Sequence, residues 1–312
     1  MSMKATRDAY GEWLVETGKT NNDIVVVDAD LAESTKTILF AKAYPDRFFD
    51  VGAAEQNLIV IAAGLSLGGK RVYASSFAYF LTARAWDQIR NIVAHDNLNV
   101  TLVASHGGFS AAADGASHLA FQDIALMRII PNMRVVVPVD AEETKHALDA
   151  AIKLVGPLYM RLRRDKEPIQ QKPYQFKLGR AETMKDGYDI TLISCGPMID
   201  TSLKAAALLK QHEIDAKVLN VHTIKPLDIQ ALVESAKATG AVITVEDHSI
   251  YGGLGGAVAE VLSQEYPVPI RILGVPDVFG SSSRNADSLL KEYGLTPDQL
   301  AATAEKIIEE RK

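Results

Sequence analysis

Side chains capable of acid–base chemistry gather between Asp50 and His118. Glu55 opens a segment whose next residues, Leu58 to Leu67, are almost wholly apolar. A carboxylate at the mouth of a buried helix suits the helix dipole, so Glu55 taken alone is most simply a cap. A carboxyl group held in a dry place can also share a proton with a ligand. Glu55 is therefore a candidate catalytic residue whose role depends on its neighbours.

An aromatic cluster that includes Phe77 and Phe80 follows the predicted strand 72–75. Open α/β sheets bind ligands at the carboxyl ends of their strands, so these rings could line a binding site. Clustered aromatic side chains are equally typical of ordinary core packing. This segment alone leaves both interpretations open.

A loop rich in glycine and alanine follows the predicted strand 100–104 and carries His106, Asp114 and His118. Small residues let a ligand approach the backbone closely. The three polar residues lack the compact spacing of a zinc signature and no cysteine accompanies them, which disfavours a metal site. Two histidines and an aspartate on one loop favour a polar substrate pocket.

Three arginines, Arg161, Arg163 and Arg164, lie at the end of the predicted strand 157–161. Strand alternation sends Arg161 and Arg163 to one face and Arg164 to the other. The planar guanidinium group suits a phosphate, so one of these residues could anchor a phosphorylated substrate. Salt bridges to the acidic surface are the alternative. The glycines of 252–256, by contrast, predict tight packing of a helix on a sheet rather than a dinucleotide site.

The elements that must position these residues follow an α/β pattern with mainly parallel strands. The first half predicts five strands, at 23–27, 72–75, 100–104, 134–138 and 157–161. It predicts five helices, at 4–17, 55–67, 81–94, 120–128 and 141–154. Residues 167–188 carry prolines and little periodicity, and we expect a linker there. The second half predicts strands at 189–194, 216–220, 241–246 and 270–274, with helices at 198–211, 228–238, 256–265 and 296–311.

The composition narrows the class of protein further. The chain has 312 residues, a net charge of −6 and a pI of about 5.7. Nucleic acid is not an expected partner, because phosphate-backbone binding needs a concentrated basic surface. The single cysteine, Cys195, lies in an apolar run and indicates a reducing compartment. With neither a signal-peptide core nor a long apolar stretch, the sequence predicts a cytoplasmic protein with no membrane association.

In their order along the chain, these blocks resemble the C-terminal half of transketolase. The resembling segments are Asp28-Ala29-Asp30-Leu31 with Ser34, Gly52 to Asn57, Ser76 to Phe80 with Arg84 to Arg90, Ser105 to Gly108, Asp114 to His118, Arg164, Val245-Glu246-Asp247-His248 and Gly252 to Gly256. The resemblance implies two three-layer α/β/α domains: a pyrimidine-binding domain at 1–166 and a smaller transketolase C-terminal domain at 189–312. Thiamine diphosphate is the implied cofactor.

The resemblance also implies a role for each candidate residue. Glu55 matches the glutamate that hydrogen-bonds N1′ of the cofactor's aminopyrimidine and so promotes loss of the thiazolium C2 proton. The matches for the cofactor pocket are Phe77 and Phe80 as the aromatic wall, His118 as the residue that closes it, and Asp30 nearby. The matches for the substrate are His106 at the carbonyl end, Asp114 at a sugar hydroxyl, and Ser34 and Arg164 at the phosphate, with Arg161 as the reserve candidate.

One family motif is absent: the glycine-aspartate-glycine segment that holds the metal and the diphosphate. The expectation is therefore a separate N-terminal subunit that supplies this half-site with Mg²⁺ or Ca²⁺, in an α₂β₂ assembly acting on sugar phosphates. Related alternatives are a deoxyxylulose-phosphate synthase-like subunit and the β subunit of a 2-oxo-acid dehydrogenase. A non-catalytic paralogue that binds a partner is the alternative from another class.

Overall fold

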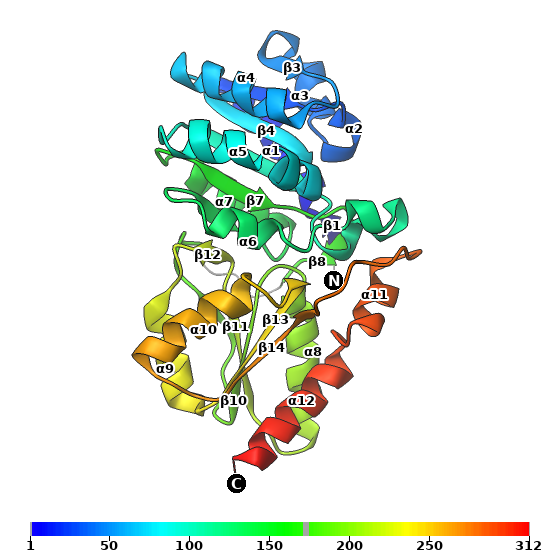
Figure 1. Cartoon of the computed structure of the whole chain (residues 1–312), viewed down its shortest axis with the longest axis vertical. Helices are drawn as coiled ribbons and strands as arrows, with labels where there is room; N and C mark the ends of the chain where they lie inside the picture. Colours follow the sequence, from blue (N-terminus) through cyan, green and yellow to red (C-terminus); the bar gives the residue numbers. More distant parts are fainter. Residues whose placement is uncertain (1, 171–174, 312) are drawn as a thin grey trace.

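The computed structural model describes residues 2–170 and 175–311, which form two stacked α/β units (Figure 1). The sheet of the first unit has seven strands in the order β12-β6-β7-β5-β4-β2-β3. Its strands are β2 (Ile24–Asp28), β3 (Phe48–Asp50), β4 (Arg71–Phe77), β5 (Val100–Ser105), β6 (Arg134–Val136), β7 (Leu158–Arg161) and β12 (Thr223–Lys225). Every neighbouring pair is parallel except β12 and β6. The five predicted strands of this half are confirmed.

Helices cover both faces of this sheet. They are α1 (Thr6–Gly18), α2 (Ala32–Thr35), α3 (Ile38–Ala43), α4 (Glu55–Leu67), α5 (Trp86–Gln88), α6 (Asp123–Arg128) and α7 (Ala141–Ala151). The buried side chains of α1, α3 and α7 pack on one face, and those of α4 and α6, with the partly buried Trp86 of α5, on the other. Asp140 caps α7, because its carboxylate accepts hydrogen bonds from the backbone N–H groups of Glu142 and Glu143.

Two predicted helices differ from the structure. The segment predicted as one helix at 81–94 consists of π-helical turns, Phe80–Arg84 and Ile89–Ala94, on either side of α5. The buried residues Leu81, Ala85, Ile89 and Val93 recur every four positions. An α-helix has 3.6 residues per turn, so wider turns keep all four on the buried side. The helix predicted at 120–128 begins only at Asp123, because Ala120 instead forms β-bridges with the loop at Gly107 and Gly108.

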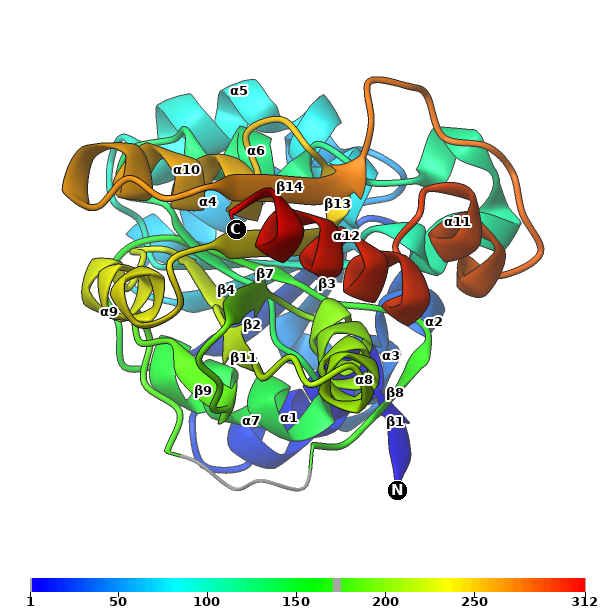
Figure 2. The same cartoon turned by 90° about the horizontal axis from the view of Figure 1, so that it is seen from below.

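The second unit has a five-stranded sheet in the order β14-β13-β10-β11-β9. Its strands are β9 (Glu182–Lys185), β10 (Ile190–Ser194), β11 (Ala216–Asn220), β13 (Val242–Ser249) and β14 (Ile270–Val275). Its helices are α8 (Met198–Gln211), α9 (Ile229–Thr239), α10 (Leu254–Glu265), α11 (Ala286–Glu292) and α12 (Pro297–Glu310). Seen from below, α8 and α12 lie together and apart from α9 and α10, which cover the other face (Figure 2). Both units are thus three-layered.

The segment expected to be a linker contains regular structure. β8 (Lys166–Pro168) pairs with β1 (Met3–Ala5), and β9 forms the edge of the second sheet. Short edge strands of three or four residues carry too little periodicity to be recognised in a sequence. Residues 171–174 of this expected linker lie outside the described residues.

The two units share an apolar core. β12 belongs to the second half of the chain by sequence but extends the first sheet, where it pairs with β6. One cluster of buried side chains also includes residues of both units, such as Leu102 and Leu219. In the second unit, a Cβ on Gly255 would lie 2.4 Å from the side chain of Ile272, so the predicted close packing of helix on sheet is confirmed. Among residues 2–170 and 175–311, no helix is long and apolar enough to cross a membrane.

Candidate active site

Glu55 lies in the first turn of α4, and only 4% of its surface is exposed. Its carboxylate accepts a hydrogen bond from Ser76 Oγ at 3.3 Å and an ion-paired one from Arg84 Nη1 at 3.2 Å. These partners come from β4 and from the π-helical turn that follows it. The carboxylate thus contacts a neighbouring element, whereas a simple cap would bond to the N–H groups of its own helix.

The predicted aromatic wall stands beside this carboxylate. Phe77 and Phe80 are stacked with their ring centroids 6.0 Å apart, and the ring of His118 meets Phe80 edge-on at 4.9 Å. The guanidinium carbon of Arg84 lies 4.0 Å from the centroid of Phe80. Arg84 therefore connects the ring face to the carboxylate of Glu55. Arg84 begins one of the segments that resemble the family, but the sequence predicted no role for it; its position one helical turn after Phe80 was a further signal.

His106 lies at the end of β5, buried to 2% exposure and in the left-handed conformation with φ of 60°. Its ring stacks on Phe77 with a centroid distance of 3.8 Å, and Nδ1 is 2.8 Å from Ser105 Oγ. Burial, with the nearby positive charges of Arg7 and Arg164, lowers the pKa of His106 to about 3. At neutral pH its imidazole is uncharged, so it can donate or accept a hydrogen bond without introducing a charge.

A cationic corner lies beside His106. Arg164 Nη1 pairs with Asp114 at 3.2 Å, and Arg7 Nη1 donates to the backbone oxygen of Ser34 at 2.8 Å. Burial lowers the pKa of Arg7, and the charge of Arg164 lowers it further. Within the described part of the chain, Nε of Arg7 is buried without a hydrogen-bond partner. Sequence reasoning missed Arg7, which lies in a segment recognised only as a helix.

The loop after β2 presents Asp30, the short helix α2 that follows presents Ser34, and a buried carboxylate holds this segment. Asp28 accepts hydrogen bonds from the Leu31 backbone N–H at 2.7 Å and from the hydroxyls of Thr35 at 2.7 Å and Thr37 at 2.9 Å. Burial raises the pKa of Asp28 to about 6. Asp30 itself is exposed, with a φ of 64°.

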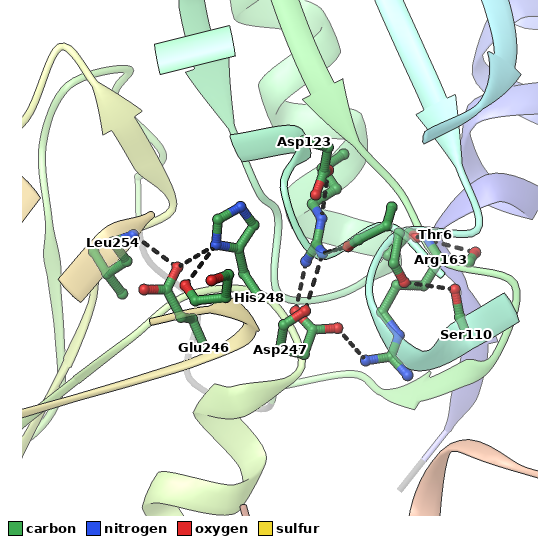
Figure 3. A network of polar contacts seen from close by, with 12 residues as sticks. Thr6, Ser110, Asp123, Arg163, Glu246, Asp247, His248 and Leu254 are labelled. Atoms are coloured by element: carbon green, nitrogen blue, oxygen red, sulfur yellow. Dashed lines mark hydrogen bonds and ion pairs between the residues drawn. The ribbon is translucent and has the colours of Figure 1, made fainter. Parts of the chain in front are cut away.

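Arg161 ends β7 and Arg163 and Arg164 follow it, and the three divide as strand alternation predicts. Arg161 and Arg163 both bind Asp247, whereas Arg164 contacts Asp114 on the other side. Arg161 is fully buried, and its Nε, Nη1 and Nη2 donate to Asp123, Asp247 and the Ala120 carbonyl (Figure 3). Every guanidinium nitrogen of Arg161 is therefore already bonded within the protein. Of these three arginines, only Arg164 remains a candidate for binding phosphate.

The structure brings the other predicted residues together at one edge of the first sheet. They lie at or after the carboxyl ends of β2, β4, β5 and β7, or at the start of α4. Open α/β sheets bind ligands at this carboxyl-terminal edge. Ring contacts join Phe77 to both histidines and Phe80 to His118. This edge offers a buried carboxylate, an aromatic face, an uncharged imidazole and a cationic corner. Such a set is suited to a planar cofactor and a phosphorylated substrate.

Family models match nearly the whole chain. The model for the transketolase pyrimidine-binding domain covers residues 2–169, and the model for the transketolase C-terminal domain covers residues 179–300. The chain therefore belongs to the transketolase family. Relatives in this family imply the use of thiamine diphosphate.

Individual relatives refine this assignment. A Methanocaldococcus jannaschii protein, provisionally named a transketolase C-terminal section, is 46% identical over 99% of this chain and 97% of its own length. The 6-deoxy-6-sulfo-D-fructose transketolase subunit of Clostridium sp. (strain MSTE9) is 40% identical over 98% of this chain and 95% of its own. A solved structure described as a split gene transketolase, inactive β4 tetramer, is 49% identical with a TM-score of 0.91, covering 98% of both chains. The chain thus corresponds to the C-terminal half of a split transketolase.

Proposed function

We propose that this chain is the C-terminal subunit of a thiamine-diphosphate-dependent transketolase that moves a two-carbon ketol unit from a ketose phosphate to an aldose phosphate. The observation that carries the proposal is Glu55, a buried carboxylate bound by Ser76 and by Arg84, whose guanidinium group lies over the ring of Phe80. A separate N-terminal subunit supplies the diphosphate half-site. The split-gene relative, described as an inactive tetramer of β chains, supports a need for this second subunit.

The residues around Glu55 fit the pyrimidine of the cofactor. The guanidinium group of Arg84 is planar, lies against Phe80 and donates to Glu55. An aminopyrimidine shares these properties, because it too is planar and carries N–H donors. When bound, thiamine diphosphate supplies the electron sink that cleavage of a carbon–carbon bond beside a carbonyl requires. Glu55 and Phe80 would hold its pyrimidine, with Phe77 and His118 enclosing it and Asp30 nearby.

The chain's own residues then act on the proton and on the substrate. Glu55, almost excluded from water, holds a carboxylate that can share a proton with a ring nitrogen. His106 hydrogen-bonds the carbonyl end of the donor as a neutral group. Asp114 accepts a hydrogen bond from a sugar hydroxyl, and Arg164, assisted by Ser34, binds the substrate phosphate. We assign Arg7 to the same phosphate site, because its buried Nε has no hydrogen-bond partner among the described residues.

The metal belongs to the partner in this proposal. In residues 2–170 and 175–311, no three His, Cys, Asp or Glu side chains are arranged to hold an ion. We assign Mg²⁺ or Ca²⁺, with the diphosphate, to the N-terminal subunit of a cytoplasmic α₂β₂ enzyme. Relatives named for 6-deoxy-6-sulfo-D-fructose and for apulose 4-phosphate support anionic sugars as the substrate class.

Substitution of Glu55 by Gln tests the role proposed for this carboxylate. In the assembled enzyme we expect exchange of the cofactor's C2 proton to collapse, while assembly with the N-terminal subunit persists. Glu33→Gln, which changes an exposed carboxylate on α2, is the matched control and should leave exchange unchanged. Exchange at the wild-type rate in Glu55→Gln would remove Glu55 from this role.

A further inference from the structure

A carboxylate of the C-terminal domain lies buried against the loop that carries His106. This carboxylate belongs to Asp247 in β13, whose side chain has no exposed surface. Its Oδ1 accepts a hydrogen bond from Arg161 Nη1 at 2.5 Å, and its Oδ2 accepts one from Arg163 Nη1 at 3.2 Å (Figure 3). Both arginines belong to the pyrimidine-binding half, so the carboxylate connects the two halves of the chain.

The same carboxylate fills the space beside the two residues that follow His106. A Cβ built on Gly108 would lie 1.9 Å from Oδ2 of Asp247, and one on Gly107 would lie 2.7 Å from Cγ of Arg161. The glycine backbone is therefore packed directly on the Asp247–Arg161 pair. Gly107 N–H also donates to the carbonyl of Leu162 at 2.9 Å, which attaches the loop to the strand end that carries these arginines.

His106 needs such support because of its backbone conformation. Its φ is 60°, and Gly108 has a φ of 56°. A residue with a side chain keeps a left-handed conformation only where its surroundings enforce it. The packed glycines supply that constraint on one side, and the stacking of the imidazole on Phe77 supplies it on the other.

The pair that supports the loop is itself fixed. Arg161 Nε binds Asp123 at 2.8 Å, and its Nη2 binds the Ala120 carbonyl at 2.9 Å. Arg161 and Arg163 balance the two fully buried carboxylates, Asp123 and Asp247, in charge. Removing one member of a buried ion pair leaves the other charge uncompensated. The position of Arg161 therefore depends on Asp247.

We propose that Asp247 is a positioning residue, through which the C-terminal domain fixes the backbone of residues 106–108 and so the orientation of His106 in the active site. The inference rests on the proposed function only in taking His106 as a substrate contact. The C-terminal domain thereby contributes to catalysis without touching the substrate.

Hydrogen exchange in the full chain tests the structural step without any activity assay. In Asp247→Ala, the amides of residues 106–110 should exchange about tenfold faster, while those in β5 stay protected. Asp165→Asn is the matched control, because this half-exposed carboxylate binds Arg163 but does not touch the loop; it should leave exchange at 106–110 unchanged. If Asp247→Ala does not fold, Asp247→Asn keeps the size of the side chain. It should still accelerate hydrogen exchange of the same amides, by a smaller factor. Unchanged exchange at 106–110 in the folded variant overturns the proposal.

A double-mutant cycle in the complex with the N-terminal subunit tests the link to His106. Asp247→Ala should lower kcat/KM by about tenfold or more in the wild-type background and by little in a His106→Ala background. A loss by the same factor in both backgrounds means that Asp247 does not act through His106, and overturns the proposal. If the wild-type complex transfers no ketol unit, the proposed function fails, whereas the exchange measurement still decides the role of Asp247.

Discussion

Asp28 gives the pH dependence of folding that can be calculated most directly from the structure. Its side chain is fully buried against α2, the short helix that presents Ser34, and its two oxygens accept three hydrogen bonds. Burial raises its pKa from 3.8 to about 6 despite those bonds. The folded protein therefore binds a proton at Asp28 more tightly than the unfolded chain does. The stability that this proton contributes is fully present below pH 3.8 and is lost as the pH rises through about 6.

The magnitude follows from the two pKa values. Each pKa unit corresponds to about 1.4 kcal/mol, so the full effect is roughly 3 kcal/mol and the part between pH 4 and pH 8 is about 2 kcal/mol. Asn at this position keeps the shape of the side chain and cannot ionise. Its amide can donate to the hydroxyls of Thr35 and Thr37, while its oxygen accepts from Leu31 N–H. Asp28→Asn should therefore gain about 2 kcal/mol of stability relative to wild type between pH 4 and pH 8.

Urea unfolding of both proteins at pH 4, 6 and 8 measures this difference. The comparison uses the change in relative stability with pH, so any constant effect of the substitution cancels. Asp46→Asn, which alters an exposed carboxylate, should show the pH profile of the wild type. If the stability difference between Asp28→Asn and wild type does not change between pH 4 and pH 8, the argument from burial is refuted.

Three further predictions concern other charged groups. Arg164→Ala should raise KM for phosphorylated donors by the equivalent of about 1–3 kcal/mol and leave unphosphorylated donors nearly unaffected; an equal loss with both would contradict phosphate binding. Arg161→Met should lower the free energy of unfolding in urea by about 3–5 kcal/mol, because Asp123 and Asp247 lose their shared cation; a loss below about 1 kcal/mol would contradict the buried network. Burial raises the pKa of Glu143 from 4.5 to about 8, so its contribution to stability is present below pH 4.5 and is lost as the pH rises through 8. The wild-type Tm should accordingly fall relative to that of Glu143→Gln between pH 4.5 and pH 8, and the difference should level off above pH 8. Parallel curves between pH 4.5 and pH 8 would exclude this effect.

The parts of the site that could be predicted from the sequence are those fixed by neighbouring residues. The carboxyl ends of strands are recognisable from hydrophobic runs, so Phe77, His106 and Arg164 could be placed after predicted strands, whereas Glu55 taken alone was most simply a cap. Strand alternation likewise separated Arg164 from Arg161 and Arg163.

The parts that could not be predicted depend on contacts between distant segments. Arg7 reaches Ser34 only because α1 packs beside the loop after β2, and nothing in its own helix signals this. Asp247 meets Arg161 across 86 positions of sequence, and the pairing follows from how the two units stack. β12 has three residues and no periodicity, so its place in the first sheet is set by its partner β6. Long-range pairing of this kind lies outside local sequence patterns.

The most direct test of the central claim is a reconstitution assay. This chain is mixed with an N-terminal subunit that carries the glycine-aspartate-glycine motif, together with thiamine diphosphate and Mg²⁺. Transfer of the ketol unit from xylulose 5-phosphate to ribose 5-phosphate, and from a panel of other anionic ketoses, is then measured. We predict transfer in the mixture and none with either chain alone. Transfer by one chain alone, or a mixture that forms the complex but acts on no donor of the panel, would contradict the account.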